Sequence, residues 1–273
     1  MTRTARAIAA VQLLAACAGL TAVFMVAGCA SQDTSSASSA ELETPSDESP
    51  TRRRARIRLE LASGYFAEGK TEVALDEVKQ VIAIDPSFAP AYDLRGLILM
   101  RLNDNKAAED SFRRAISLSP RDPNVHHNLG WLMCEQRRYK EAQQAFDVAM
   151  ANPMYTGRAK TLLAQGVCEA RSGREADAEK SLSRSYELDP ANPVTGYSLA
   201  KLLYQRGDNQ KALFYIRRLN NSELANAESL WLGIKVERRM KNTIAMRQLG
   251  DVLRSRFGGS PQAAAYERGA FDE

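Results

Sequence analysis

A short pattern of small and large apolar residues returns about every 34 residues along this chain, six times. Each copy begins with Ala, places Phe or a branched aliphatic residue four positions later, and adds a small or aliphatic residue three positions after that. Apolar residues three and four positions apart predict amphipathic helices. The copies begin at Ala74, Ala108, Ala142, Ala178, Ala212 and Ala245.

A partner helix is predicted upstream of each of these helices. A small residue stands twelve positions before each starting Ala, which lets two antiparallel helices approach closely: Ala62, Gly96, Gly130, Gly166, Ala200 and Gly233. Proline stops the second helix at Asp85-Pro86, Ser119-Pro120 and Asp189-Pro190. This period and order are typical of tetratricopeptide repeats. We therefore expect an all-α fold, a tetratricopeptide-repeat superhelix of about six helix-turn-helix repeats over residues 52–252.

The repeat spacing is lengthened once, between Ala142 and Ala178, by two additional residues. They fall around residues 152–157, where we expect a longer connection. After the sixth repeat, residues 253–273 are expected to cap the exposed end, because the terminal units of a solenoid need a covered outer face.

The N-terminus has the layout of an export signal, with Arg3 and Arg6 before an apolar run from residue 7 to residue 26. The run ends in Val-Ala-Gly before Cys29, which resembles a bacterial lipobox. We predict a lipoprotein signal peptide over residues 1–28 and lipidation of Cys29. The alternatives are an uncleaved membrane helix, because the run approaches 20 residues, and a looser lipobox at Cys17.

Residues 29–51 are expected to form the lipidated cysteine and a disordered tether. The segment is rich in Ser and Ala, then acidic with two prolines, a composition that buries too little apolar surface to fold. By analogy with such lipoproteins, Ala30 rather than Asp in the second mature position favours the outer membrane. A flexible tether of this length reaches roughly 25 Å.

No catalytic constellation is visible. The chain has 44% hydrophobic and 7% aromatic residues and a net charge of +4, which suits a helical protein with solvated basic faces. His126 and His127 are adjacent and point in different directions, so they do not form a metal pair. We expect no enzyme activity, no cofactor, no metal site, no nucleic-acid partner and a monomeric chain.

Two cysteines remain beside Cys17 and Cys29. Cys134 and Cys168 fall near the ends of the first helices of consecutive repeats. Those helices pack side by side, and export leads to an oxidising compartment. From position alone, a disulfide and two buried thiols are equally compatible with the sequence.

Residues of the first helices that the core does not use are predicted to line a partner-binding groove. The set is Leu59, Ser63, Phe66, Asp93, Leu97, Met100, His127, Trp131, Tyr197, Lys201 and Tyr204. Exposed aromatics suit an amphipathic or extended partner segment. Phe66, Trp131 and Tyr204 are the predicted hot spots; the alternative is that each packs against a neighbouring repeat.

Several short runs resemble the type IV pilus biogenesis/stability lipoproteins, which act as pilotins for the pilus secretin. They are residues 127–134, 151–155, 166–168 and 207–212, and the tail from 256 to 269. The resemblance covers nearly all of residues 52–273, in order and behind a lipobox. The chain departs from the family at His126 and His127 and at residues 258–260.

The resemblance implies an outer-membrane lipoprotein on the periplasmic face, anchored in lipid through acylated Cys29. It implies that the protein binds the pilus secretin subunit and promotes its localisation and multimerisation, so that type IV pili are assembled. It also implies a disulfide between Cys134 and Cys168. The alternative function is a general periplasmic adaptor for outer-membrane protein assembly or polysaccharide export.

Overall fold

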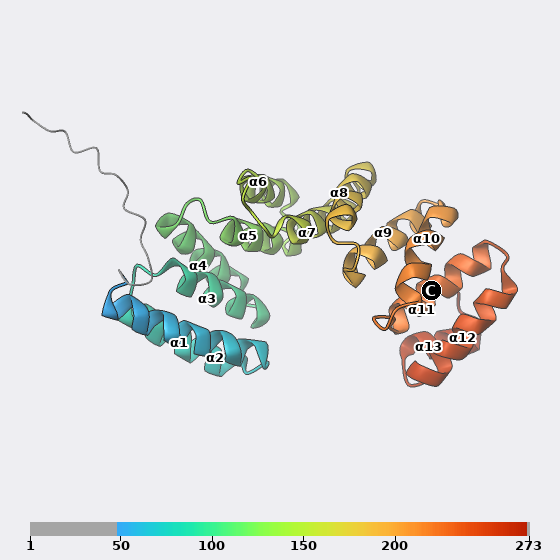
Figure 1. Ribbon diagram of the computed structural model, residues 1–273, viewed down its shortest axis with the longest axis horizontal. Helices are drawn as coiled ribbons and strands as arrows, with labels where there is room; N and C mark the ends of the chain where they lie inside the picture. The colour runs from blue at the N-terminus through green and yellow to red at the C-terminus, as the bar shows by residue number, and fades with distance from the viewer. Residues whose placement is uncertain (1–47, 272–273) are drawn as a thin grey trace, which may run out of the picture. The chain divides into compact units, whose positions relative to one another are not determined.

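The computed structural model describes residues 48–271, which fold into α-helices with no strand within that range (Figure 1). The predicted signal peptide, Cys29 and most of the predicted tether lie outside the described residues. The first six helices are α1 (Pro50–Ala67), α2 (Thr71–Ile84), α3 (Ala89–Arg101), α4 (Asn105–Leu118), α5 (Pro123–Glu135) and α6 (Tyr139–Met150). The rest are α7 (Arg158–Arg171), α8 (Glu175–Leu188), α9 (Pro193–Gln205), α10 (Asn209–Asn220), α11 (Ala227–Arg239), α12 (Thr243–Phe257) and α13 (Pro261–Arg268).

These helices form six antiparallel pairs, from α1–α2 to α11–α12, as the repeat pattern predicts. The second helix of each pair also contacts the first helix of the next, and successive first helices contact one another. The all-α tetratricopeptide-repeat superhelix is therefore confirmed.

Helix ends follow the proline and capping signals. Helices α2, α4 and α8 stop directly before the three predicted Asp-Pro or Ser-Pro pairs. The first helix begins at Pro50, earlier than the predicted start at residue 52, because the Ser49 hydroxyl accepts a hydrogen bond from the Arg52 amide at 3.1 Å. Proline is well suited to this first helical position, which needs no amide donor.

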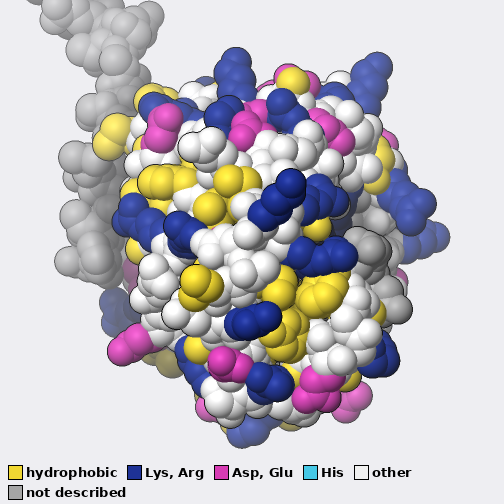
Figure 2. All heavy atoms as spheres, turned by 90° about the vertical axis from the view of Figure 1, so that its right-hand side faces the viewer, with side chains coloured by type: hydrophobic (Ala, Val, Ile, Leu, Met, Phe, Trp, Pro, Cys, Tyr) yellow, Lys and Arg dark blue, Asp and Glu magenta, His cyan; other side chains and the backbone are white. Residues whose placement is uncertain are grey.

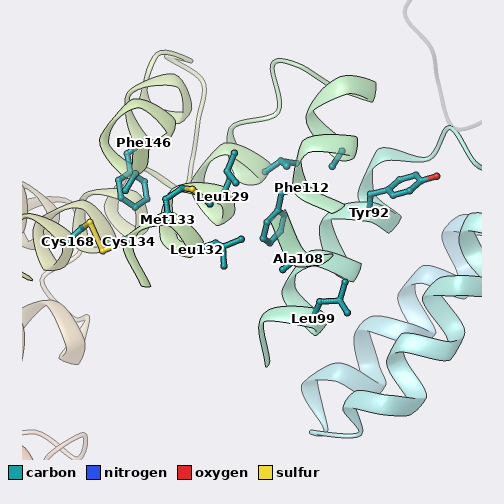
Figure 3. Packing of buried hydrophobic residues seen from close by; sticks show 14 residues of the cluster. Tyr92, Leu99, Ala108, Phe112, Leu129, Leu132, Met133, Cys134, Phe146 and Cys168 are labelled. Atoms are coloured by element: carbon teal, nitrogen blue, oxygen red, sulfur yellow. A yellow bond between two sulfur atoms is a disulfide. The ribbon is translucent and has the colours of Figure 1, made fainter. Parts of the chain in front are cut away.

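A small residue in the first helix of a repeat leaves room for a large side chain from the second helix. A Cβ atom added to Gly96 would lie 2.4 Å from the Phe112 ring, and one added to Gly130 would lie 2.7 Å from the Phe146 ring. Both rings are buried, and Figure 3 shows them in the core of repeats two and three. Phe112 and Phe146 thus hold the two helices of their own repeat together and also fill the space between repeats.

The longer connection is present between α6 and α7 and spans residues 151–157. It buries Tyr155, whose hydroxyl lies 3.0 Å from Thr161 Oγ1 on α7. A Cβ on Gly157 would lie 2.6 Å from the Tyr155 ring, so only glycine fits there. The two additional residues therefore anchor an aromatic side chain against the next repeat.

The C-terminal boundary differs from the predicted one at residue 252. Helix α12 continues to Phe257, and the cap consists of α13 and the residues after it. Tyr266 of α13 covers Gly250, where a Cβ would lie 2.1 Å from the ring. Phe271 stacks on Trp231 with 5.6 Å between ring centroids. The helix runs on because its last turn supplies Leu253 and Phe257 to the apolar cluster beneath the cap.

Cys134 of α5 and Cys168 of α7 are joined by a disulfide in the structure (Figure 3). Their Cα atoms are 5.7 Å apart, and both side chains are buried. The bond crosses from one repeat to the next, at the repeat junction that also holds the longer connection.

A larger side chain at the point where the two helices of a repeat meet is expected to destabilise the fold. Gly130→Ala forces a methyl group onto the buried Phe146 ring and should lower the free energy of unfolding by about 1–3 kcal/mol. Gly64→Ala is the matched control, because a Cβ there meets no atom within 4 Å, and it should stabilise helix α1 by about 0.5–1 kcal/mol. Urea unfolding of both variants measures the two free energies of unfolding. Equal changes in the two variants would contradict the close contact between Gly130 and Phe146.

The disulfide is expected to contribute to stability through the 34-residue separation that it closes. Converting both cysteines to Ser should reduce the free energy of unfolding by about 2–4 kcal/mol. Mass spectrometry after thiol alkylation without reductant should show both cysteines of the exported protein unlabelled. Labelling of both thiols in the folded protein would show that the bond does not form.

Candidate functional site

A groove runs over the first helices of repeats four to six, which lie side by side as α7, α9 and α11. A hollow of about 350 Å³ lies between α7 and α9, and a second of about 180 Å³ lies between α9 and α11. Tyr197 and Lys201 line both hollows and so join them. We call this surface the first-helix groove and define it by Val167, Arg171, Tyr197, Lys201, Tyr204, Trp231 and Lys235.

The first-helix groove combines aromatic rings with cations. The Lys235 ammonium lies 5.5 Å from the Trp231 ring centroid and 6.0 Å from that of Tyr204. Burial, together with the negative charge of Glu228, raises the pKa of Tyr197, so its phenol stays protonated at neutral pH. Lys201 is exposed between the two hollows. Rings and ammonium groups together favour a partner segment that is apolar and acidic.

Three of the predicted groove residues, Tyr197, Lys201 and Tyr204, are thus brought together by the structure. Trp231 and Lys235 belong with them, although they were not predicted. Trp231 stands 34 residues after Tyr197, and Lys235 stands 34 residues after Lys201, so the repeat period indicates both residues. They were not predicted because the small residues Ala200 of α9 and Gly233 of α11 are 33 positions apart. Aligning α11 by its small residue shifts the expected groove positions by one residue.

The predicted groove residues of the first two repeats lie closer to the core. Leu59, Leu97 and Met100 are half-buried and pack against the core clusters of these repeats. Ser63 is exposed, but its hydroxyl donates to the Leu59 carbonyl of its own helix at 2.8 Å. Leu59, Leu97 and Met100 therefore contribute to the packing of α1 and α3.

Each of the three predicted hot-spot rings lies under an arginine. The Arg101 guanidinium lies 3.7 Å from the Phe66 ring centroid, and that of Arg239 lies 4.0 Å from the Tyr204 centroid. Both arginines also donate to the backbone carbonyl of the residue whose ring they cover. The third contact, Arg171 over Trp131, is longer at 5.2 Å. All three rings are half-buried and pack on neighbouring repeats, so they serve packing and partly remain available for binding.

The prediction that His127 lines the groove is wrong, because the side chain is only 5% exposed. Its Nδ1 lies 2.9 Å from Thr161 Oγ1, which also contacts the Tyr155 hydroxyl. Burial, with the nearby positive charge of Lys160, lowers the pKa of His127 to about 4. The imidazole is therefore neutral at pH 7 and belongs to the polar core beneath the longer connection.

Asp93, also predicted to line the groove, is half-buried beside repeat three. The Asn128 amide donates to both of its carboxylate oxygens, at 2.9 and 3.1 Å. Burial raises the pKa of Asp93 to about 6, and the hydrogen bond from Asn128 opposes this rise. The two hydrogen bonds between Asn128 and Asp93 link α5 to α3.

The described residues 48–271 hold no group of three or more His, Cys, Asp or Glu side chains placed to bind a metal ion. Within the same residues, none of the helices combines the length and apolar character needed to cross a membrane. The arrangement that the described chain does offer is a set of rings and cations suited to binding a protein segment.

Comparison with known proteins agrees with this reading of the fold. Tetratricopeptide-repeat families match residues 59–123 and 99–166. The type IV pilus assembly protein PilF of Pseudomonas aeruginosa is 27% identical over 202 residues, which are 74% of this chain and 80% of PilF.

Solved structures give the same relatives. The crystal structure of PilW, described as a widely conserved type IV pilus biogenesis factor, has a TM-score of 0.72 and 28% identity, and the match covers 78% of this chain and 97% of PilW. The PilF structure from Pseudomonas aeruginosa also has a TM-score of 0.72, at 24% identity, covering 81% of this chain and all of the other, and it shows the shared fold. The chain has the tetratricopeptide-repeat fold and is similar, over about three quarters of its length, to the type IV pilus proteins PilF and PilW.

Proposed function

We propose that this protein is a type IV pilus biogenesis factor, an outer-membrane lipoprotein that acts as a pilotin for the pilus secretin. The similarity to PilF and PilW, which extends along most of both chains, carries the proposal. The hollows over the first helices of repeats four to six supply a surface for binding a partner.

The first-helix groove is the proposed binding surface for a secretin segment. Tyr197 and Tyr204 offer half-buried rings and the buried Trp231 forms part of the floor, while Lys201 and Lys235 offer positive charge. An amphipathic helix or extended segment with apolar and acidic side chains would satisfy both kinds of group. Aromatic residues in such grooves often carry most of the binding energy.

The proposed anchor is the acylated Cys29. Several acyl chains hold a protein stably in a membrane, whereas one chain alone is marginal. A tether of about 20 residues would then let the repeats reach secretin subunits near the periplasmic face of the outer membrane. The disulfide between α5 and α7 suits the oxidising periplasm.

Reversing one groove charge is expected to weaken secretin binding. Lys201 lies between the two hollows of the groove, so Lys201→Glu should repel an acidic segment and raise the dissociation constant roughly fivefold at low salt. The control is Lys180→Glu, a matched reversal of an exposed lysine on the second helix α8, outside the groove. Calorimetric titration with the periplasmic part of the secretin measures both variants.

Loss of binding in both variants to the same degree would indicate a general effect of net charge and would contradict the groove assignment. Wild-type protein that does not bind the secretin at all would contradict the pilotin role and favour a general periplasmic adaptor.

A further inference from the structure

A cavity of about 470 Å³ lies among α10, α11 and α12, in the last two repeats. Its walls are mainly apolar, and the side chains that form them are Leu213, Ile216, Leu230, Leu249 and Val252. This volume falls within the range of pockets that take small organic groups.

The glycine at this cavity has different surroundings from the glycines of repeats two to four. In repeats two and three, Phe112 and Phe146 cover the glycine of the first helix, and in repeat four the buried Leu182 comes within 2.7 Å of a Cβ placed on Gly166. In repeat six a Cβ placed on Gly233 would meet the Asn220 amide nitrogen of α10 first, and the half-buried Leu249 would lie farther away, at 3.2 Å. A polar side chain thus covers this glycine, and Asn220 and Leu249 both border the cavity.

Two buried oxygen atoms on residues that line this cavity have no hydrogen-bond partner. Glu237 is 1% exposed; its Oε1 accepts from Arg217 Nε at 2.7 Å, but its Oε2 has no donor. The Asn220 amide donates through Nδ2 to the Ser229 carbonyl at 3.0 Å, while its Oδ1 has no partner. Buried acceptors without a donor are rare and costly. They point to a ligand that brings a donor.

The cavity is separate from the first-helix groove. Leu230, Gly233 and Glu237 line the cavity, whereas Trp231 and Lys235 line the groove. At 100° per residue these two sets occupy opposite faces of α11. A ligand in the cavity and a partner segment in the groove therefore contact different surfaces.

The exposed charge among the residues that line the cavity is positive, because the Glu237 carboxylate is buried. Arg217 lines it and has a half-exposed side chain. Figure 2 views the molecule from the side of its C-terminal repeats and shows hydrophobic side chains bordered by Lys and Arg on that face. A neutral ligand group suits these surroundings better than a cationic one, so the missing donor is best supplied by an indole N–H or a phenol O–H.

We propose that the cavity among α10, α11 and α12 is an anchor pocket for an aromatic side chain with a hydrogen-bond donor, Trp above all, from a segment of a partner protein. The ring fills the cavity between Leu230, Leu249 and Val252, and its donor reaches Glu237 or Asn220. This site is additional to the first-helix groove and does not depend on the proposed role in pilus biogenesis.

Indole is the probe that tests the pocket, with the ¹⁵N-labelled full chain observed by NMR. Saturable shifts are expected at the Gly233 and Ala245 amides, which line the cavity. Binding of 1-methylindole, which lacks the donor, should be weaker by roughly fivefold. Leu249→Phe places a larger side chain in the wall of the cavity and should abolish the indole shifts, and thermal unfolding establishes that this variant is folded.

The control variant is Lys201→Glu, which alters the first-helix groove and should leave indole binding unchanged. Equal affinities for indole and 1-methylindole in the wild-type chain would overturn the proposed donor contact. Indole shifts that persist in folded Leu249→Phe, or that map to Trp231 and Lys235, would overturn the assignment of the cavity.

Discussion

The contact between a small residue on one helix and a large side chain on the next is the constraint on which each repeat depends. Gly96 and Gly130 let Phe112 and Phe146 reach the backbone of the partner helix. A Cβ atom at either glycine would overlap the phenyl ring and prevent this approach. Because the contact is made within one repeat, it fixes the angle of the pair before any neighbour is added. The remaining faces of the pair are then free to pack on adjacent repeats.

Packing between repeats determines where binding surface is left. The first helices lie side by side, and residues on their outer faces become half-buried where arginines from the following repeats cover them, as Arg101 covers Phe66. Towards the C-terminus, hollows remain between α7, α9 and α11, where Tyr197 and Lys201 are accessible. The groove therefore results from uneven packing along otherwise similar repeats.

The sequence predicted the fold well because the repeat period averages over many positions. The helix pairs, the proline stops and the longer connection before α7 all followed from spacing. Side-chain exposure was harder to predict: His127 has the repeat position of a groove residue, but Thr161 and the inserted Tyr155 enclose it. Trp231 was missed for a different reason, since one residue fewer between repeats five and six shifts the face that α11 presents. Such effects depend on neighbours that a periodic pattern does not specify.

The state of the pilus secretin in a deletion strain tests the proposed role most directly. Secretin multimers are resolved on a gel that preserves the ring, with a Cys29→Ala strain examined beside the deletion. We expect secretin monomers in the deletion strain, and loss or mislocalisation of the rings when Cys29 is replaced. Normal rings at normal abundance in the outer membrane of the deletion strain would contradict it.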